Sequence, residues 1–232
     1  MKKNTLMILC IIVLTAITGL VLRNFFVERA RYRAMMKPTG TDMTEFKQAV
    51  RNFTDGKSED INAIGLRIGA DELALLEELD AVPRLNVAHT QVGDVEMELI
   101  SRLPGLTFLD LTQTRVTDTG LQYLKNHPTL EEVCLNKIRF SNNGLQVLLT
   151  IPDLKGLHLW NTHTTDTTCQ TLAKLTNLEI LSLDATMVTD KGIQLLYPLK
   201  KLKILKIGDC PISPEGRKTV QQHWPKTQIY GL

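Results

Sequence analysis

Cys134 and His158 are the residues of this chain whose types and spacing could do chemistry together, and they lie 24 positions apart. A cysteine beside a histidine can serve as a nucleophile with its base. With a carboxylate from Asp110 or Asp184, the pair could instead hold a zinc ion. Both uses require a fold that places residues 24 apart side by side.

A 24-residue repeat covers residues 58–232 and predicts such a fold. A fixed period in the twenties is typical of a solenoid, in which each unit buries its apolar face against its neighbours. Degenerate copies begin at Ser58, and Ile229 is in phase for a truncated last strand, which gives about seven coils. The clearest copies read Leu106-x-x-Leu109-x-Leu111, Leu130-x-x-Val133-x-Leu135, Leu154-x-x-Leu157-x-Leu159, Leu178-x-x-Leu181-x-Leu183 and Leu202-x-x-Leu205-x-Ile207.

Each repeat contains a short strand, a turn and a helix. In the strand, apolar residues such as Leu109 and Leu111 alternate and point inward. The helix carries Leu121 and Leu124 and their counterparts in other repeats. In the turn before it, Thr117 or Asp118 can cap the first amides of the helix. The expected class is therefore an α/β solenoid of strand–turn–helix coils.

The pattern L-x-x-L-x-L-x-x-T-x-V-T-D-x-G-L-x-x-L resembles leucine-rich repeats of the threonine/cysteine-ladder subtype, in their bacterial membrane-anchored form. The resemblance implies a right-handed curved solenoid, with strands on the concave face and helices on the convex face. It also implies that the ladder side chains point inward and bond neighbouring backbone. Ile138 departs from the ladder, whose members are Thr90, Thr114, Thr162, Thr186 and Cys210.

The concave face is where a partner is expected to bind, because strand residues between the repeat leucines alternate to the exposed side. Phe108 and Trp160 are aromatic residues on that face, and aromatic residues are frequent anchors of protein interfaces. The alternative is that these two rings only shield neighbouring strands. The candidate partner-binding residues are Phe108, Asp110, Cys134, Asn136, His158, Trp160, Asn161 and Asp184.

Catalysis is not expected. A concave sheet offers no oxyanion hole, no helix amino terminus aimed at the thiol and no evident pocket. The sequence has no G-x-x-x-x-G-K, G-x-S-x-G or H-E-x-x-H motif. We therefore predict no enzyme activity, no catalytic residue, no metal and no cofactor, and a metal or thiol site at Cys134 and His158 remains an alternative.

The amino terminus predicts a membrane anchor. Residues 5–22 form an uncharged apolar run between Lys3 and Arg23. Eighteen helical residues reach roughly 27 Å, enough to span a hydrocarbon core. The alternative is a cleaved signal peptide, whose best small-residue site, at residues 16–18, is imperfect.

Three regions follow from these patterns. Residues 1–23 are assigned to a membrane anchor or uncleaved signal, residues 24–57 to a juxtamembrane helix and an amino-terminal cap, and residues 58–232 to the solenoid with a carboxy-terminal cap. The cap helix is expected to begin at Asp42, with the apolar stripe Phe46, Val50 and Phe53 covering the first coil.

The orientation in the membrane has two interpretations. The basic cluster after the apolar run (Arg23, Arg29, Arg31, Arg33 and Lys37) favours a cytoplasmic carboxyl side. Two lysines directly before the run instead resemble an export signal, and on that basis we expect a single-pass protein with its repeats outside the cytoplasm.

Composition excludes some partners. A net charge of +2 is too small to indicate nucleic-acid binding, and the four cysteines have no C-x-x-C spacing that would indicate a disulfide or zinc framework. The leading hypothesis is a non-catalytic, membrane-tethered scaffold that binds another protein through its concave face. The alternative is a structural or envelope spacer without a specific partner.

Overall fold

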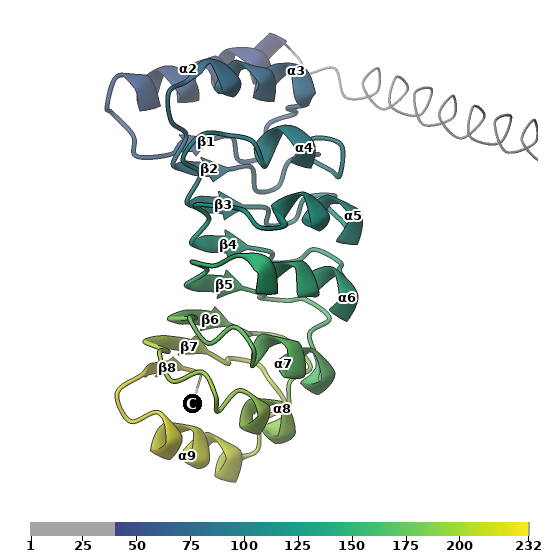
Figure 1. Ribbon diagram of the computed structural model, residues 1–232, viewed down its shortest axis with the longest axis vertical. Helices are drawn as coiled ribbons and strands as arrows, with labels where there is room; N and C mark the ends of the chain where they lie inside the picture. Colours follow the sequence, from purple (N-terminus) through teal and green to yellow (C-terminus); the bar gives the residue numbers. More distant parts are fainter. Residues whose placement is uncertain (1–39, 232) are drawn as a thin grey trace, which may run out of the picture. The chain divides into compact units, whose positions relative to one another are not determined.

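The computed structural model describes residues 40–231 of the 232-residue chain, within one compact unit, Pro38–Leu232 (Figure 1). The anchor expected at residues 5–22 and the juxtamembrane helix expected at residues 24–37 lie outside the described residues. Among residues 40–231, no helix combines the length and the apolar character that a membrane crossing needs.

The strands form one parallel sheet of eight, in sequence order. Each strand pairs with the next at a step of 24 residues, so that Leu109 lies opposite Leu85 on one side and Val133 on the other. The stacked solenoid predicted from the repeat is thus confirmed, including the last strand at Ile229. The strands are β1 (Ile61–Asn62), β2 (Arg84–Asn86), β3 (Phe108–Asp110), β4 (Glu132–Cys134), β5 (Gly156–His158), β6 (Ile180–Ser182), β7 (Ile204–Lys206) and β8 (Gln228–Tyr230).

The helices of the repeats stack on the opposite side, outside the curve that the strands line (Figure 1). Most are single turns, several of which continue into a 3-10 turn. They are α3 (Ala70–Leu73) with η1 (Ala74–Glu78), α4 (Met97–Ile100), α5 (Asp118–Leu121) with η2 (Gln122–Leu124), α6 (Asn142–Leu145) with η3 (Gln146–Thr150), α7 (Asp166–Leu172), α8 (Asp190–Leu195) and α9 (Pro214–His223).

The core lies between the two layers and is built from the repeat positions. Leu109 and Leu111 are fully buried from the strand side, and Leu121 and Leu124 from the helix side. The ladder residues close the same core with internal hydrogen bonds. The Thr162 hydroxyl, for example, donates to the carbonyl of Leu159 at 2.8 Å.

The helix caps connect successive coils. Thr117 caps α5 by accepting from the amide of Thr119, as the sequence suggests, but Asp118 acts elsewhere. Its carboxylate accepts from the amide of Ser141 at 2.8 Å and from the Ser141 hydroxyl in the following coil. The same contact recurs between Asp94 and Thr117, Asp166 and Thr189, and Asp190 and Ser213.

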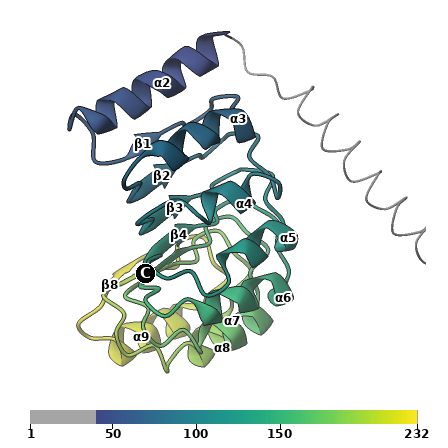
Figure 2. The ribbon, with the colours of Figure 1, turned by 45° about the horizontal axis from the view of Figure 1, so that its top comes forward.

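The stack is covered at both ends. Helix α2 (Gly40–Thr54) lies across the first coil (Figure 2), with Phe46 fully buried and Val50 and Phe53 packed on the core. Its first residue precedes the predicted start at Asp42 by two positions. At the far end, the buried Trp224 donates its indole N–H to the carbonyl of Leu199 at 3.0 Å.

Candidate functional site

The strand face is the exposed side of β1–β8, and it brings the candidate row together. Asp110, Cys134, His158 and Ser182 are direct partners in the register of β3, β4, β5 and β6. Cys134 is buried, with 7% of its surface exposed, and the other three are half-buried or buried. The 24-residue spacing therefore does place Cys134 beside His158.

The carboxylate that reaches His158 is that of Glu132, which the sequence-based candidate list did not include. Oε1 of Glu132 lies 2.9 Å from Nε2 of His158. Asp110 and Asp184, the carboxylates proposed as zinc ligands, make other contacts. Asp110 accepts from the amide of Thr112 at 2.8 Å. Asp184 accepts from the amide of Gly208 at 2.8 Å and from the hydroxyl of Ser182 at 2.7 Å.

Gly156 allows Glu132 to reach across the sheet. Gly156 is the direct partner of Glu132 in β5, and His158 lies two residues further along that strand. A Cβ atom at position 156 would lie 2.6 Å from Cγ of Glu132, a distance that real Cβ atoms do not show. Glycine inside a strand often marks such a close approach. The missing side chain thus leaves room for Glu132 to lie over β5 and contact His158.

The electrostatics of this group disfavour a reactive thiol. Burial raises the pKa of Cys134, and the negative charges of Asp110 and Glu132 raise it further. A thiol with a raised pKa stays protonated, whereas the nucleophile is the thiolate. The hydrogen bond from His158 lowers the pKa of Glu132, which therefore stays ionised. The arrangement supports an ionised carboxylate beside a neutral thiol.

The two aromatic candidates are each covered by a cation. The guanidinium of Arg84 lies 4.0 Å from the ring centroid of Phe108, and Nζ of Lys137 lies 4.3 Å from that of Trp160. A third pair, Lys206 and Tyr230, has a separation of 5.8 Å. Trp160 is 38% exposed. Phe108 and Trp160 were predicted from the sequence, whereas the cations that cover them were not.

The remaining candidates serve the backbone. Asn136 accepts from the amide of Trp160 at 2.8 Å and donates to the hydroxyl of Thr112 at 3.0 Å. Asn161 has a left-handed backbone with φ of 52°, and its amide donates to the carbonyl of Asp184. These polar groups stabilise the turns after the strands while remaining at the edge of the strand face.

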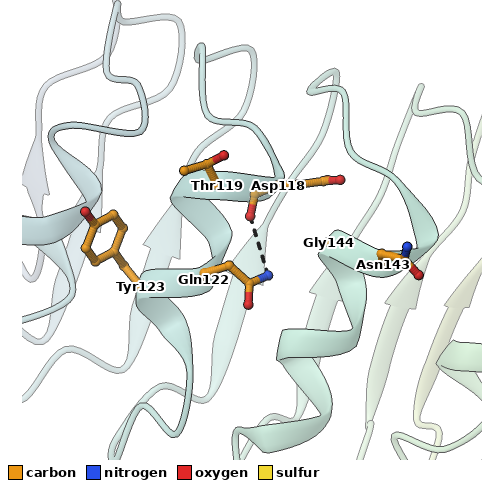
Figure 3. A pocket seen from close by; sticks show the side chains of 6 residues that line it. All are labelled: Asp118, Thr119, Gln122, Tyr123, Asn143 and Gly144. Atoms are coloured by element: carbon orange, nitrogen blue, oxygen red, sulfur yellow. Dashed lines mark hydrogen bonds between the residues drawn. The ribbon is translucent and has the colours of Figure 1, made fainter. Parts of the chain in front are cut away.

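A hollow of about 560 Å³ lies on the helix side, away from these candidates (Figure 3). The sticks of Figure 3 come from α5, η2 and the start of α6, and Gln122 donates to the carbonyl of Asp118 at 3.5 Å. Asp118 already accepts from the amide and hydroxyl of Ser141, and the phenol of Tyr123 is the other ionisable group in the lining. The lining residues are Asp118, Thr119, Gln122, Tyr123, Asn143 and Gly144.

Comparison with known proteins supports the fold. A family model described as Leucine Rich repeat matches residues 104–125 and 199–220. No curated protein sequence matches the chain. A leucine-rich-repeat protein of Leptospira interrogans aligns at 21% identity over 70% of this chain and 39% of its own, with a TM-score of 0.51. A Bacteroides fragilis protein aligns at 18% identity over 68% of this chain and 49% of its own, with a TM-score of 0.50.

A third structure, internalin C2 of Listeria monocytogenes, aligns at 25% identity over 67% of this chain and 62% of its own, with a TM-score of 0.49. The chain thus spans less than two thirds of each of these three structures. Such likeness concerns the fold alone. With its 24-residue register, its eight parallel strands and its two matched repeats, the described part of the chain has the α/β solenoid fold of leucine-rich-repeat proteins.

Proposed function

We propose that this protein is a non-catalytic scaffold that binds another protein through the strand face. Solenoids of this kind present an extended curved surface that is suited to protein binding. The observation that carries the proposal is the set of aromatic rings on the strand face, each covered by a cation: Phe108 by Arg84 and Trp160 by Lys137.

Fixed aromatic rings are effective binding anchors. A cation within about 6 Å of a ring centroid is attracted to the ring face and restricts its movement. A side chain that is ordered before binding loses less conformational entropy when a partner covers it. Aromatic residues and arginine are also enriched among residues that dominate interface energies. The strand face therefore offers ordered anchors instead of mobile ones.

A comparison of matched surface variants tests this assignment. The double variant Phe108→Ala/Trp160→Ala removes the anchors, whereas Tyr123→Ala/Leu195→Ala removes two exposed apolar side chains, 42% and 38% accessible, from the helix side. Saturable binding of membrane-extract protein to the immobilised chain should be lost in the first variant and kept in the second. Equal binding by both variants would exclude the strand face as the binding surface.

We further propose that residues 5–22 tether the protein to a membrane as a single-pass anchor, with the repeats outside the cytoplasm. The uncharged run and the preceding Lys2 and Lys3 support this arrangement. Protease added to intact cells should then digest a carboxy-terminal tag. Digestion only after the membrane is broken would place the repeats in the cytoplasm and reverse the proposed orientation.

The competing proposal is a structural spacer, and the internal contacts of the strand face favour it. Asp110, Asn136 and Asp184 all accept from backbone amides of the solenoid itself. If the face serves only to hold the coils together, no saturable binding partner should be found, and the anchor variants should behave as the native protein does.

A further inference from the structure

We infer that Glu132, Cys134 and His158 form a binding site for one Zn²⁺ ion on the strand face, with a fourth coordination position left to water. The three side chains come from the adjacent strands β4 and β5. Their ligand atoms, a carboxylate oxygen, a thiol sulfur and an imidazole nitrogen, all lie within 4.8 Å of one another. The site lies beside the proposed aromatic anchors, since Phe108 is the strand partner of Glu132, but the inference does not depend on them.

The distances are close to those of a zinc site. Zn²⁺ binds sulfur at about 2.3 Å and nitrogen or oxygen at about 2.0–2.2 Å, so that tetrahedral ligand atoms lie roughly 3.3–3.8 Å apart. In the structure, Nε2 of His158 and Oε1 of Glu132 are 2.9 Å apart, joined by a hydrogen bond that the ion would replace. Rotation of the three side chains would have to bring ligand atoms that are now up to 4.8 Å apart to these tetrahedral separations.

The ligand set indicates a transition metal and not calcium or magnesium. Thiolate and imidazole favour zinc and its first-row neighbours, whereas Ca²⁺ and Mg²⁺ take oxygen ligands. Three protein ligands with an open fourth position are the arrangement of accessible zinc sites, while purely structural sites use four. Because the metal binds the thiolate, binding must release the proton of Cys134 to solvent.

The surrounding charges are compatible with a cation. Asp110 is the strand partner of Cys134 and adds a negative charge beside the ligands, in addition to that of Glu132. Two positive groups on the same face, Arg84 in β2 and Lys206 in β7, are each two strands from the closest ligand. The guanidinium of Arg84 lies over the ring of Phe108, the strand partner of Glu132, so the two carboxylates beside the ligands also have a cation nearby.

Gly156 is a second observation that points to this site. No bulky group could occupy position 156 while Glu132 lies across β5, because an added Cβ would meet Glu132 Cγ at 2.6 Å. Position 156 holds glycine where the equivalent positions of β2–β8 hold arginine, phenylalanine, glutamate, isoleucine and glutamine. We regard Gly156 as a positioning residue, since it lets the Glu132 carboxylate meet Cys134 and His158.

Metal titration of the untagged full chain tests the inference. Cys10, which lies outside the described residues, is replaced by serine throughout so that it cannot contribute. Co²⁺ should bind at one ion per chain and produce a near-ultraviolet cobalt–thiolate charge-transfer band, which Zn²⁺ should then displace. A chain that takes up no stoichiometric metal, or that binds cobalt without the thiolate band, would overturn the proposed site.

Substitutions assign the ligands. Cys134→Ser should abolish the thiolate band, and Glu132→Gln and His158→Ala should each weaken Zn²⁺ binding by about tenfold or more. Cys169→Ser and Cys210→Ser remove other buried thiols and should leave binding unchanged. If a ligand variant unfolds, the native chain's cobalt spectrum still decides whether a thiolate is bound.

Gly156→Ala is the most specific test of the position of Glu132, because this variant retains all three ligands. The new methyl group should displace the Glu132 side chain and weaken Zn²⁺ binding by about tenfold, while the cobalt–thiolate band persists at higher metal concentration. Unchanged affinity in a folded Gly156→Ala chain would show that Glu132 is not a ligand and would overturn the three-residue site.

Discussion

The carboxylate of Asp118 lies directly against Gly144 in the next coil, so close that a Cβ atom on Gly144 would be 2.0 Å from Oδ1 of Asp118. The same Asp118 caps the following helix through Ser141. Aspartate and glycine 26 residues apart recur in this contact at Asp94 and Gly120, at Asp166 and Gly192, and at Asp190 and Gly216. The junction between α6 and α7 differs, because Asn142 there accepts from the hydroxyl of Thr168 at 2.6 Å.

The Asn142–Thr168 pair predicts the result of a double substitution at Asp118 and Gly144. Gly144→Thr alone should lower the free energy of unfolding by about 1–3 kcal/mol through overpacking against Asp118. Adding Asp118→Asn, to reproduce the Asn142–Thr168 pair, should recover part of that loss. A double-mutant cycle from urea denaturation measures the coupling, and strictly additive effects would contradict the proposed contact.

Thr90 should matter more to stability than Thr186. The Thr90 hydroxyl donates to the carbonyl of Val87 at 2.7 Å and accepts from the buried amide of Val92 at 3.2 Å. Thr90→Val leaves that amide without a partner, which costs about 1–3 kcal/mol. Thr186→Val should cost less, because Cys210 Sγ still donates to the carbonyl of Leu183. Chemical denaturation of both variants measures the loss in the free energy of unfolding. Equal losses would contradict the larger role predicted for Thr90.

His127 should make the protein sensitive to mild acid. It is 4% exposed and occupies the helix-end position that leucine fills at Leu103 and Leu199, and neither ring nitrogen has a hydrogen-bond partner among the described residues. Burial lowers the pKa of His127. The backbone of Ser101, near the ring but outside hydrogen-bond geometry, partly offsets that shift.

The sign of the pH effect follows from this lowered pKa. At neutral pH the residue is uncharged in both states, but below about pH 6.5 the unfolded chain binds a proton that the folded chain resists. Stability is therefore lost as the pH falls through this region and towards the folded pKa. His127→Leu should add about 1–3 kcal/mol at neutral pH and more in mild acid. Denaturation at two pH values checks this, and a pH-independent difference would contradict it.

A row of alternating acidic and basic residues, at 24-residue steps, should make the stability of the protein depend on salt. Lys155 lies 2.8 Å from Glu131 and Lys203 lies 2.6 Å from Glu179, and the residues of each pair are 24 positions apart. Both lysines are exposed and both glutamates are half-buried. Lys155→Glu places three acids in succession and should lower Tm at low salt, with a smaller effect at high salt because ions screen exposed charges. Lys174→Glu, just beyond α7, is the control and should change Tm little. A salt-independent loss would indicate a packing effect instead.

Trp160 fluorescence should report the cation that orders it. Trp224 is 4% exposed and Trp160 is 38% exposed, so Trp224→Phe leaves a single accessible indole. In that background, Lys137→Ala should increase acrylamide quenching and lower the anisotropy of Trp160, because the ring loses its cation at 4.3 Å. Lys125→Ala serves as the control. Unchanged anisotropy would mean that Lys137 does not order the proposed anchor.

The repeat was predictable because its signal is long-range and redundant. Every coil presents leucines at the same phase, so the sequence alone predicts that Asp110, Cys134 and His158 share a row. The contact of His158 with Glu132 was not predictable in the same way. It runs diagonally between strands and depends on the space that Gly156 leaves.

The aspartate caps show a second limit of local patterns. A threonine followed by an aspartate before a helix is compatible with either residue capping that helix. The periodic aspartates were visible in the sequence, but a local pattern cannot distinguish a cap within one coil from a cap of the next. Only the stacking of the coils gives Asp118 its partner, Ser141.

Shared caps also determine how such an array can change in length during evolution. Removal or duplication of whole 24-residue segments keeps the 26-residue spacing between cap and contact positions, whereas a segment that is not a multiple of 24 residues disrupts it. Asn142 and Thr168 belong to neighbouring coils and form a matched pair, so both must be inherited together. The array can therefore grow or shrink by whole repeats, and the irregular junction at Asn142 and Thr168 marks a place where a change of copy number carries a cost.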